Sequence, residues 1–184
     1  MIKHIGTQTI KTERLLLRKF TTEDAEAMFT NWASDKQITK FLTWEPHSSI
    51  EATRNILEGW CAAYNNNSTY NWAITLNDIP IGSISIVRLS ERSENAELGY
   101  CIGSKFWNKG YMTEAAKAVI SFLFEQVGLN RVSISHAVKN PASGEVAKKC
   151  RMKFEGRKRK CFKATDGEFL DIDIYAILRE EWYE

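Results

Sequence analysis

The chain has 184 residues, of which 43% are hydrophobic and 11% aromatic, so its length suits one domain and its apolar content suffices for a core. Its 25 lysines and arginines against 23 acidic residues leave a net charge of only +2, which argues against nucleic-acid binding through a general positive field. Ten glycines and three prolines are too few for a disordered or fibrous chain. We expect a single domain over residues 1–184.

The first half of the chain alternates between strand and helix patterns. A strand is expected at residues 15–20, followed by a helix that Thr21 and Asp24 cap. Residues 34–47 lack clean periodicity and indicate a short helix and a loop. Ser48 and Glu51 are spaced as a capping box for the next helix, which ends near Tyr64.

The second half begins with three strands and then alternates again. Strands are expected at residues 70–76, 81–89, 96–102, 131–138, 153–162 and 169–178, with hairpin turns at Asn77-Asp78 and Asp166-Gly167. The clearest helix lies between Gly110 and Gly128, and a shorter one covers residues 142–150. This order predicts a mixed α/β sheet with antiparallel hairpins at both ends and crossover helices in the middle.

The cysteines and histidines are scattered along the chain. The four cysteines form no CxxC pair, and the three histidines add no zinc-ligand spacing, so we expect no metal site. Isolated thiols suit a reducing cytosol. No apolar stretch is long enough for a signal peptide or a membrane span, which favours a cytoplasmic protein with no membrane partner.

Residues 96–115 combine a strand, a loop and the start of a helix. Gly110 stands where the backbone turns, and Lys109 adds a positive charge. The free N–H groups at a helix N-terminus bind anions, and a pyrophosphate is a natural guest. An ordinary connection between a strand and a helix is the alternative.

Motifs along almost the full chain resemble one family. They are Thr12-Glu13-Arg14-Leu15-x-Leu17-Arg18, Glu97-Leu98-Gly99-Tyr100-x-Ile102, Trp107-Asn108-Lys109-Gly110-Tyr111-Met112-Thr113-Glu114-Ala115, Asn140-x-x-Ser143-x-x-Val146-Ala147-x-Lys149, Phe154-Glu155-Gly156 and Asp166-Gly167-Glu168. In this order they resemble the GNAT superfamily of N-acetyltransferases, of the RimJ and RimL type that acetylates ribosomal-protein N-termini. The resemblance implies an α/β GNAT fold: a mixed, largely antiparallel sheet of about seven strands, splayed between the fourth and fifth and flanked by helices.

The resemblance also implies an activity. Acetyl-CoA would be the co-substrate, and an amine would attack its thioester directly in a ternary complex. The expected acceptor is the N-terminal α-amine of a ribosomal or other protein, or of a peptide. A small-amine acetyltransferase (polyamine, amino acid or aminoglycoside) and a non-catalytic acyl-CoA-binding regulator remain alternatives. A homodimer is an open expectation, and a nucleic-acid partner is not expected.

The residues expected to bind acetyl-CoA come from three segments. They are Tyr100, Cys101, Ile102, Trp107, Asn108, Lys109, Gly110, Tyr111, Met112, Thr113, Asn140 and Ser143. The family's loop pattern is Gln/Arg-x-x-Gly-x-Gly/Ala, whereas this chain has Trp107 and Met112 at the first and last positions. Because backbone N–H groups are expected to bind the phosphates, these changes leave binding in place but alter its contacts.

Two residues are the expected catalytic groups. Glu97, beside the expected thioester, is the candidate general base, directly or through water; its alternatives are an ion pair with a basic neighbour or positioning of the amine. Ser143 is the candidate donor to the leaving thiolate, because the tyrosine that many members use one turn later is replaced by Ala147. A helix-capping role is the alternative for Ser143 and for Asn140.

The acceptor side is less well defined by sequence. Trp44, Glu45 and Trp72 are expected to bind the acceptor, with core packing as the alternative. The basic run from Arg157 to Lys160 is expected on a projecting hairpin, where it would dock an acidic partner or simply be solvated. A cysteine nucleophile is not favoured, since no histidine is spaced to activate Cys101.

Overall fold

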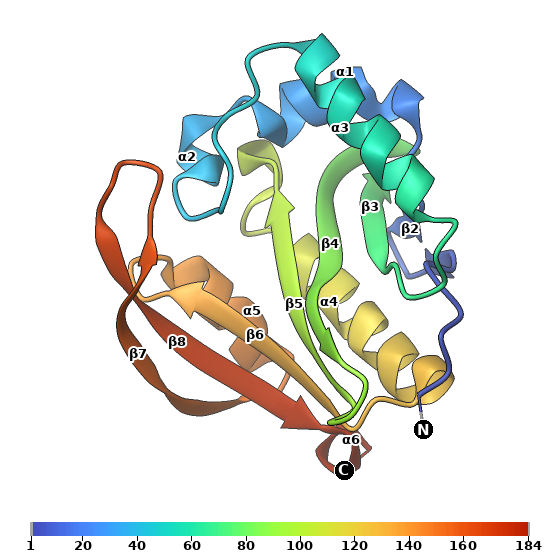
Figure 1. The fold of residues 1–184 in the computed structure, drawn as a ribbon, viewed down its shortest axis with the longest axis vertical. Helices are drawn as coiled ribbons and strands as arrows, with labels where there is room; N and C mark the ends of the chain where they lie inside the picture. The colour runs from blue at the N-terminus through green and yellow to red at the C-terminus, as the bar shows by residue number, and fades with distance from the viewer. Residues whose placement is uncertain (1, 184) are drawn as a thin grey trace.

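The computed structural model describes residues 2–183 and contains one sheet flanked by helices (Figure 1). The strands are β1 (Ile10–Lys11), β2 (Leu16–Arg18), β3 (Asn71–Leu76), β4 (Ile79–Ser90), β5 (Asn95–Ile102), β6 (Arg131–Ala137), β7 (Lys153–Lys163) and β8 (Phe169–Leu178). The helices are α1 (Ala25–Met28), α2 (Lys36–Thr39), α3 (Ile50–Ala63), α4 (Tyr111–Phe122), α5 (Pro141–Lys149) and α6 (Arg179–Trp182), with short helical turns η1 (Thr22–Asp24), η2 (Phe29–Ala33), η3 (Ser104–Phe106) and η4 (Leu123–Val127).

The sheet has eight strands in the order β1-β2-β3-β4-β5-β6-β8-β7. All neighbouring strands are antiparallel except β5 and β6, which are parallel and pair only from Asn95↔Arg131 to Leu98↔Ile134. Beyond these pairs the two strands diverge, as Figure 1 shows above the lower end of the sheet. The predicted splay between residues 96–102 and 131–138 is therefore confirmed.

Local sequence explains how the chain turns between these elements. Asn77 and Asp78 both have positive φ, at 49° and 65°, which suits a tight hairpin between β3 and β4. Gly128 has φ 85° and closes the helical segment that begins with α4, as predicted. Asn140 caps α5, and Pro141 occupies its first position, where a missing N–H costs nothing.

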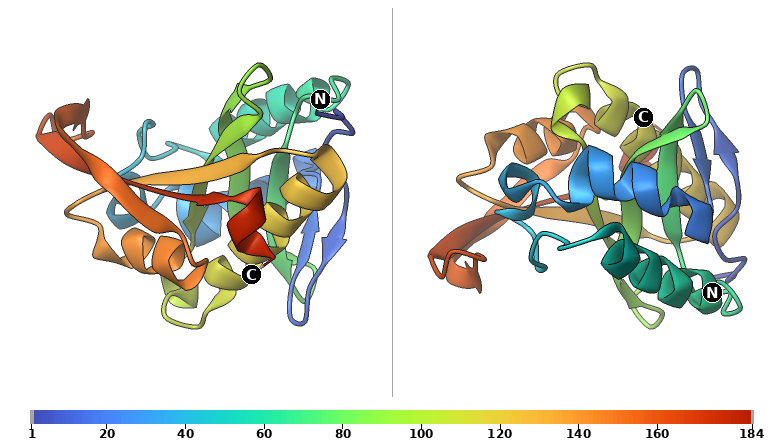
Figure 2. Two further views of the ribbon diagram at one scale, coloured as in Figure 1. Left: turned by 90° about the horizontal axis from the view of Figure 1, so that it is seen from below. Right: turned by 90° about the horizontal axis from the view of Figure 1, so that it is seen from above.

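Apolar residues fill both faces of the sheet, which lies between two layers of helices (Figure 2). On one face, α4 packs against the sheet through Ala115, Val119 and Ile120, all at 0% exposure. On the other face, the α1–α3 layer buries Trp32 and Leu57. A smaller cluster joins the β7–β8 hairpin to the loop after α2.

Three details differ from the sequence-based expectations. The eighth strand is β1, which is only two residues long and pairs with β2. The side chain that caps α3 is Ser49, whose Oγ accepts a hydrogen bond from the Ala52 N–H at 3.0 Å, so Ser48 was the wrong cap. Helix α6 was not predicted.

Within residues 2–183, none of the helices combines the length and apolarity that a membrane crossing requires.

Candidate active site

The splay between β5 and β6 opens two clefts that meet inside the protein. The large cleft, about 920 Å³, is bounded by β4, β5, β6, the β7–β8 hairpin and the aromatic side chains of the α1–α3 layer. The small cleft, about 500 Å³, is bounded by the end of β5, the loop before α4, and α5. Residues that line both clefts are Phe41, Leu42, Tyr100, Cys101, Asn140 and Ser143. The arrangement can bring two molecules together at one point from opposite directions.

The end of β5 offers backbone groups at this junction. Past Leu98, β5 no longer pairs with β6, so the β6-facing edge from Gly99 to Ile102 has no strand partner among the residues that the structure describes. Such an edge can pair with an extended ligand. Trp107 fixes the end of the strand, because its indole N–H donates to the Ile102 carbonyl at 2.9 Å.

The loop before α4 is shaped to present N–H groups to the small cleft. Asn108 and Gly110 have positive φ, at 60° and 80°. In the described part of the chain, no hydrogen bond uses the backbone N–H groups of residues 108–113. Free N–H groups at the N-terminus of a twelve-residue helix suit an anion such as a pyrophosphate, and Lys149 adds a positive charge to the lining.

A clamp from the N-terminal segment holds this loop. The clamp consists of Thr12, Arg14 and Glu114. Arg14 donates from Nε to Glu114 Oε2 at 2.7 Å and from Nη1 to the Lys109 carbonyl at 3.0 Å. Thr12 Oγ1 donates to Glu114 Oε1 at 2.6 Å. Burial raises the pKa of Glu114, but these hydrogen bonds outweigh it and lower the pKa below its usual value.

Tyr100 and Ser143 form a hydroxyl pair at the junction of the clefts. Tyr100 Oη lies 2.9 Å from Ser143 Oγ and 3.1 Å from the Ser143 carbonyl oxygen. Burial raises the pKa of Tyr100 well above its usual range, so this phenol stays protonated at neutral pH. Ser143 occupies the first turn of α5, and its N–H donates to Asn140 Oδ1 at 3.4 Å. The pair can donate a proton, and the positive end of the helix favours an anion beside it.

Cys101, next to this pair, has a thiol that is not activated. Its Sγ lies 3.3 Å from Ser83 Oγ, and burial raises the pKa of the Cys101 thiol to about 11. A thiol of this kind is almost entirely protonated at neutral pH and is a poor nucleophile. Among residues 2–183, no three His, Cys, Asp or Glu side chains gather closely enough to hold a metal ion.

Glu97 lines the large cleft from β5 and pairs with a neighbouring cation. Arg88 Nη1 on β4 donates to Glu97 Oε2 at 3.1 Å, and the Glu97 side chain is 20% exposed. Glu97 precedes Tyr100 by three residues, which is about 10 Å along a strand. It therefore faces the cleft but does not touch the hydroxyl pair.

Most of the residues expected at the acetyl-CoA site come together. All of them except Lys109 line the small cleft; Lys109 instead lies over the ring of Phe106, and its carbonyl accepts from Arg14.

The acceptor residues agree less well with expectation. Trp44 lines the large cleft and its ring packs against that of His47, whereas Glu45 is exposed and lines neither cleft. Trp72 is fully buried, its ring packs edge-on against Phe122, and its N–H donates to the Gln8 carbonyl. Because Trp72 faces the core beside α4, the expectation that it binds the acceptor was wrong.

Several residues of the site were missed. Phe41 and Leu42 line both clefts. They were missed because the loop after α2 has no sequence pattern that would have identified them. Arg88 also lines the large cleft, and so does Lys158, which was expected in the basic run but not at the acceptor site. His136 lines the same cleft, with Nδ1 2.9 Å from the Ala137 carbonyl oxygen and a ring stacked on Tyr175.

Comparison with known proteins identifies the family. The profile of a domain described as "Acetyltransferase (GNAT) domain" matches residues 14–153. The uncharacterized N-acetyltransferase YoaA of Bacillus subtilis is 30% identical over 172 residues, covering 92% of this chain and 96% of YoaA. A ribosomal-protein-serine acetyltransferase of Escherichia coli is 28% identical over 178 residues, covering 92% of this chain and 96% of that protein.

Solved structures share the fold. A GNAT-family acetyltransferase from Bacillus anthracis has a TM-score of 0.81 and 32% identity, covering 95% of this chain and 100% of that one. The ribosomal L7/L12 α-N-protein acetyltransferase RimL, solved in complex with coenzyme A, has a TM-score of 0.84 at 22% identity, covering 93% and 98% of the two chains. The family match over residues 14–153 and these relatives show that the chain belongs to the GNAT family of acetyltransferases.

Proposed function

We propose that this protein transfers the acetyl group of acetyl-CoA to the N-terminal α-amine of a protein or peptide, in a ternary complex. The observation that carries the proposal is the junction of the two clefts at Tyr100 and Ser143. Two substrates that enter from opposite sides would meet there, so no acyl-enzyme is needed. Holding both reactants in place would lower the barrier by several kcal/mol, with about 7–11 as an upper range.

The small cleft suits acetyl-CoA. Its pyrophosphate would bind the free N–H groups of residues 108–113, and its pantetheine arm would pair with the open edge of β5. A backbone N–H of that edge would then polarise the thioester carbonyl. RimL, which shares the fold, has been solved with coenzyme A, which supports this assignment.

The hydroxyl pair would protonate the leaving group. The amine nitrogen forms a bond to the thioester carbon, the carbon–sulfur bond breaks, and the thiolate takes the proton of Ser143 Oγ. Tyr100 Oη, 2.9 Å away, would return a proton to Ser143 and later recover one from solvent. The high pKa of Tyr100 supports this relay, because the phenol keeps its proton until the serine needs it.

Glu97 would take a proton from the ammonium of the acceptor through water, which leaves the neutral amine that attacks. The second proton, which the nitrogen loses as the amide forms, would pass to solvent. The separation of about 10 Å along β5 between Glu97 and Tyr100 is too long for direct contact, so a short chain of waters would have to carry the proton. The ion pair with Arg88 holds the Glu97 side chain in place in the large cleft.

The large cleft suits a peptide acceptor better than a small amine. At about 920 Å³, it lies near the upper end of the 300–1,000 Å³ range that small-molecule pockets occupy. The relatives include an enzyme named for ribosomal-protein serine acetylation, which supports the same acceptor class.

The test is release of free thiol from acetyl-CoA against a panel of acceptors. The panel holds peptides with Ser, Ala and Met at the N-terminus, spermidine and an aminoglycoside, and intact mass identifies each product. We expect α-amine acetylation of at least one peptide well above background hydrolysis. If only a small amine reacts, the proposed acceptor class is wrong; if no acceptor reacts, proposed catalysis on these classes is refuted.

A further inference from the structure

The charged residues that line the large cleft are unevenly balanced. The lining includes two cationic side chains, Arg88 and Lys158, and one carboxylate, Glu97. Cations therefore outnumber carboxylates in this cleft. Glu97 already pairs with Arg88 at 3.1 Å. Within residues 2–183, no carboxylate lies within ion-pair distance of Lys158, which is exposed on β7. This cleft would repel a polyamine and attract an acceptor that carries a negative charge.

Neither of the two cations lies next to the transfer point. Arg88 stands opposite Glu97 in the β4–β5 ladder, three residues or about 10 Å from Tyr100 along the strand. Lys158 stands opposite Ile172 on β8, and Ile172 stands opposite Ala137 on β6. Two strand spacings put Lys158 about 10 Å from β6, on the far side of the cleft. Both cations therefore lie well away from the site where the amine reacts.

This distance limits what the acceptor can be. The carboxylate carbon of a free α-amino acid is only two bonds from its amine nitrogen, so this group cannot span about 10 Å. An extended peptide advances about 3.3 Å per residue, so its fourth residue, three steps from the first, lies at about the right distance. We infer that the acceptor is a peptide N-terminus with an acidic side chain close to its fourth position, recognised by Lys158 and Arg88.

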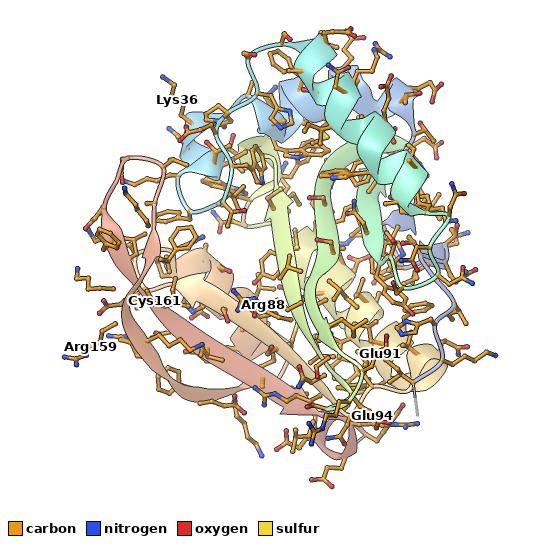
Figure 3. All side chains as sticks on the ribbon, in the orientation of Figure 1. Lys36, Arg88, Glu91, Glu94, Arg159 and Cys161 are labelled. Carbon is orange, nitrogen blue, oxygen red and sulfur yellow. The ribbon has the colours of Figure 1, made fainter. Side chains whose placement is uncertain are left out.

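Figure 3 indicates a matched control. Arg88 lies over the opening between β5 and β6, whereas Arg159 points away from the molecule. Arg159 is adjacent to Lys158 on the same exposed strand but lines neither cleft. Lys158→Glu and Arg159→Glu therefore make the same charge change, and only the first changes the charge of the cleft.

The experiment compares hexapeptides that begin with serine, carry Asp, Asn or Lys at the fourth position, are otherwise uncharged and have amidated C-termini. This inference rests on the proposed function. For the wild type, we expect kcat/KM to fall from Asp to Asn to Lys, with about three- to tenfold between the extremes, because partly exposed charge pairs contribute modestly. The preference should shrink in 1 M salt, where the screening length is about 3 Å. Lys158→Glu should abolish or reverse it, and Arg159→Glu should leave it unchanged.

The outcomes separate the two claims. Peptides that are acetylated equally well whatever their fourth residue would overturn the acidic-acceptor inference and leave the proposed function standing. A preference for the lysine peptide, or a preference that Arg159→Glu removes as fully as Lys158→Glu, would also overturn it. Acetylation of spermidine with no reaction of any peptide would overturn the proposed function and the inference together.

Discussion

Replacing Arg14 with alanine tests whether the N-terminal clamp holds the loop before α4. Arg14 hydrogen-bonds both Glu114 in the first turn of α4 and the Lys109 carbonyl in the loop. Its guanidinium also lies 4.6 Å from the ring centre of Tyr111. Removing the side chain frees the loop from a segment that is nearly a hundred residues away in sequence. We expect weaker binding of acetyl-CoA and an unchanged fold.

The size of this effect depends on the hydrogen bonds that the Arg14 guanidinium makes. A hydrogen bond to a charged group contributes about 1.5–3 kcal/mol. The Arg14 side chain is 42% exposed, so solvent screens its contribution, and Glu114 keeps its bonds to Thr12 Oγ1 and to the Arg14 backbone N–H. We expect a decrease of about 1–2 kcal/mol in the free energy that positions the loop, which corresponds to about a 5- to 30-fold rise in the KM for acetyl-CoA.

Initial rates at varied acetyl-CoA, with a saturating acceptor, measure this effect. Arg92→Ala is the matched control, since Arg92 is an exposed arginine that lines neither cleft. Thermal unfolding should show that both variants fold, and kcat should change little because Arg14 does not line the junction. A KM for acetyl-CoA within twofold of wild type, in a folded Arg14→Ala variant, would refute the role of the clamp.

Four further predictions follow from the junction and its surroundings. Ser143→Ala should lower kcat by about 10- to 100-fold while acetyl-CoA affinity stays within a few-fold. General acid catalysis accelerates reactions by about 10²–10⁴-fold, and Tyr100 lies close enough to replace part of that effect. Unchanged turnover would remove the proposed proton donor. Cys101→Ala should keep turnover within about threefold, because a thiol with a pKa of about 11 is not a nucleophile at neutral pH, and loss of activity in a folded variant would contradict this. Burial raises the pKa of Tyr100 in the folded state, so the contribution of this phenol to stability is present below its unfolded pKa of about 10 and is lost as pH rises above that value. Between pH 9 and 11, Tyr100→Phe should therefore lose less free energy of unfolding than wild type, as measured by urea titration. Equal losses in the two proteins would contradict the raised pKa. Gly144→Ala should lower the free energy of unfolding by about 1–3 kcal/mol, because the new Cβ would lie 2.7 Å from His136 Nε2, and an unchanged thermal midpoint would show that the imidazole moves away freely.

Sequence patterns predicted the fold well where periodicity and turn chemistry agreed. Local signals predicted the helix that begins at Tyr111 and the cap at Asn140, whereas the splay of the strands was an expectation from the family resemblance. The prediction for Ser48 failed because Ser49 follows it directly, and the spacing to Glu51 cannot say which hydroxyl reaches a free N–H. The strand β1 was missed because two residues carry no detectable period.

The candidate site was predictable only in part. Two stretches, residues 100–113 and 140–149, supply most of the lining of the small cleft, so motifs identified more than half of it but not the residues that come from α2 and the loop after it. Trp72 was misassigned because β3 is buried on both faces, which removes the alternation that would have revealed the direction of its side chains. The clamp of Arg14 on Glu114 and the position of Lys158 depend on contacts between distant segments, which no local pattern reports.

The central claim is that the thioester is held where the two clefts meet. The most direct test is a crystal structure of the protein with coenzyme A. We predict that the sulfur lies within hydrogen-bonding distance of Ser143 Oγ, with the pyrophosphate on the N–H groups of residues 108–113. Coenzyme A bound outside the small cleft, or a sulfur atom directed away from Ser143 and Tyr100, would contradict the account.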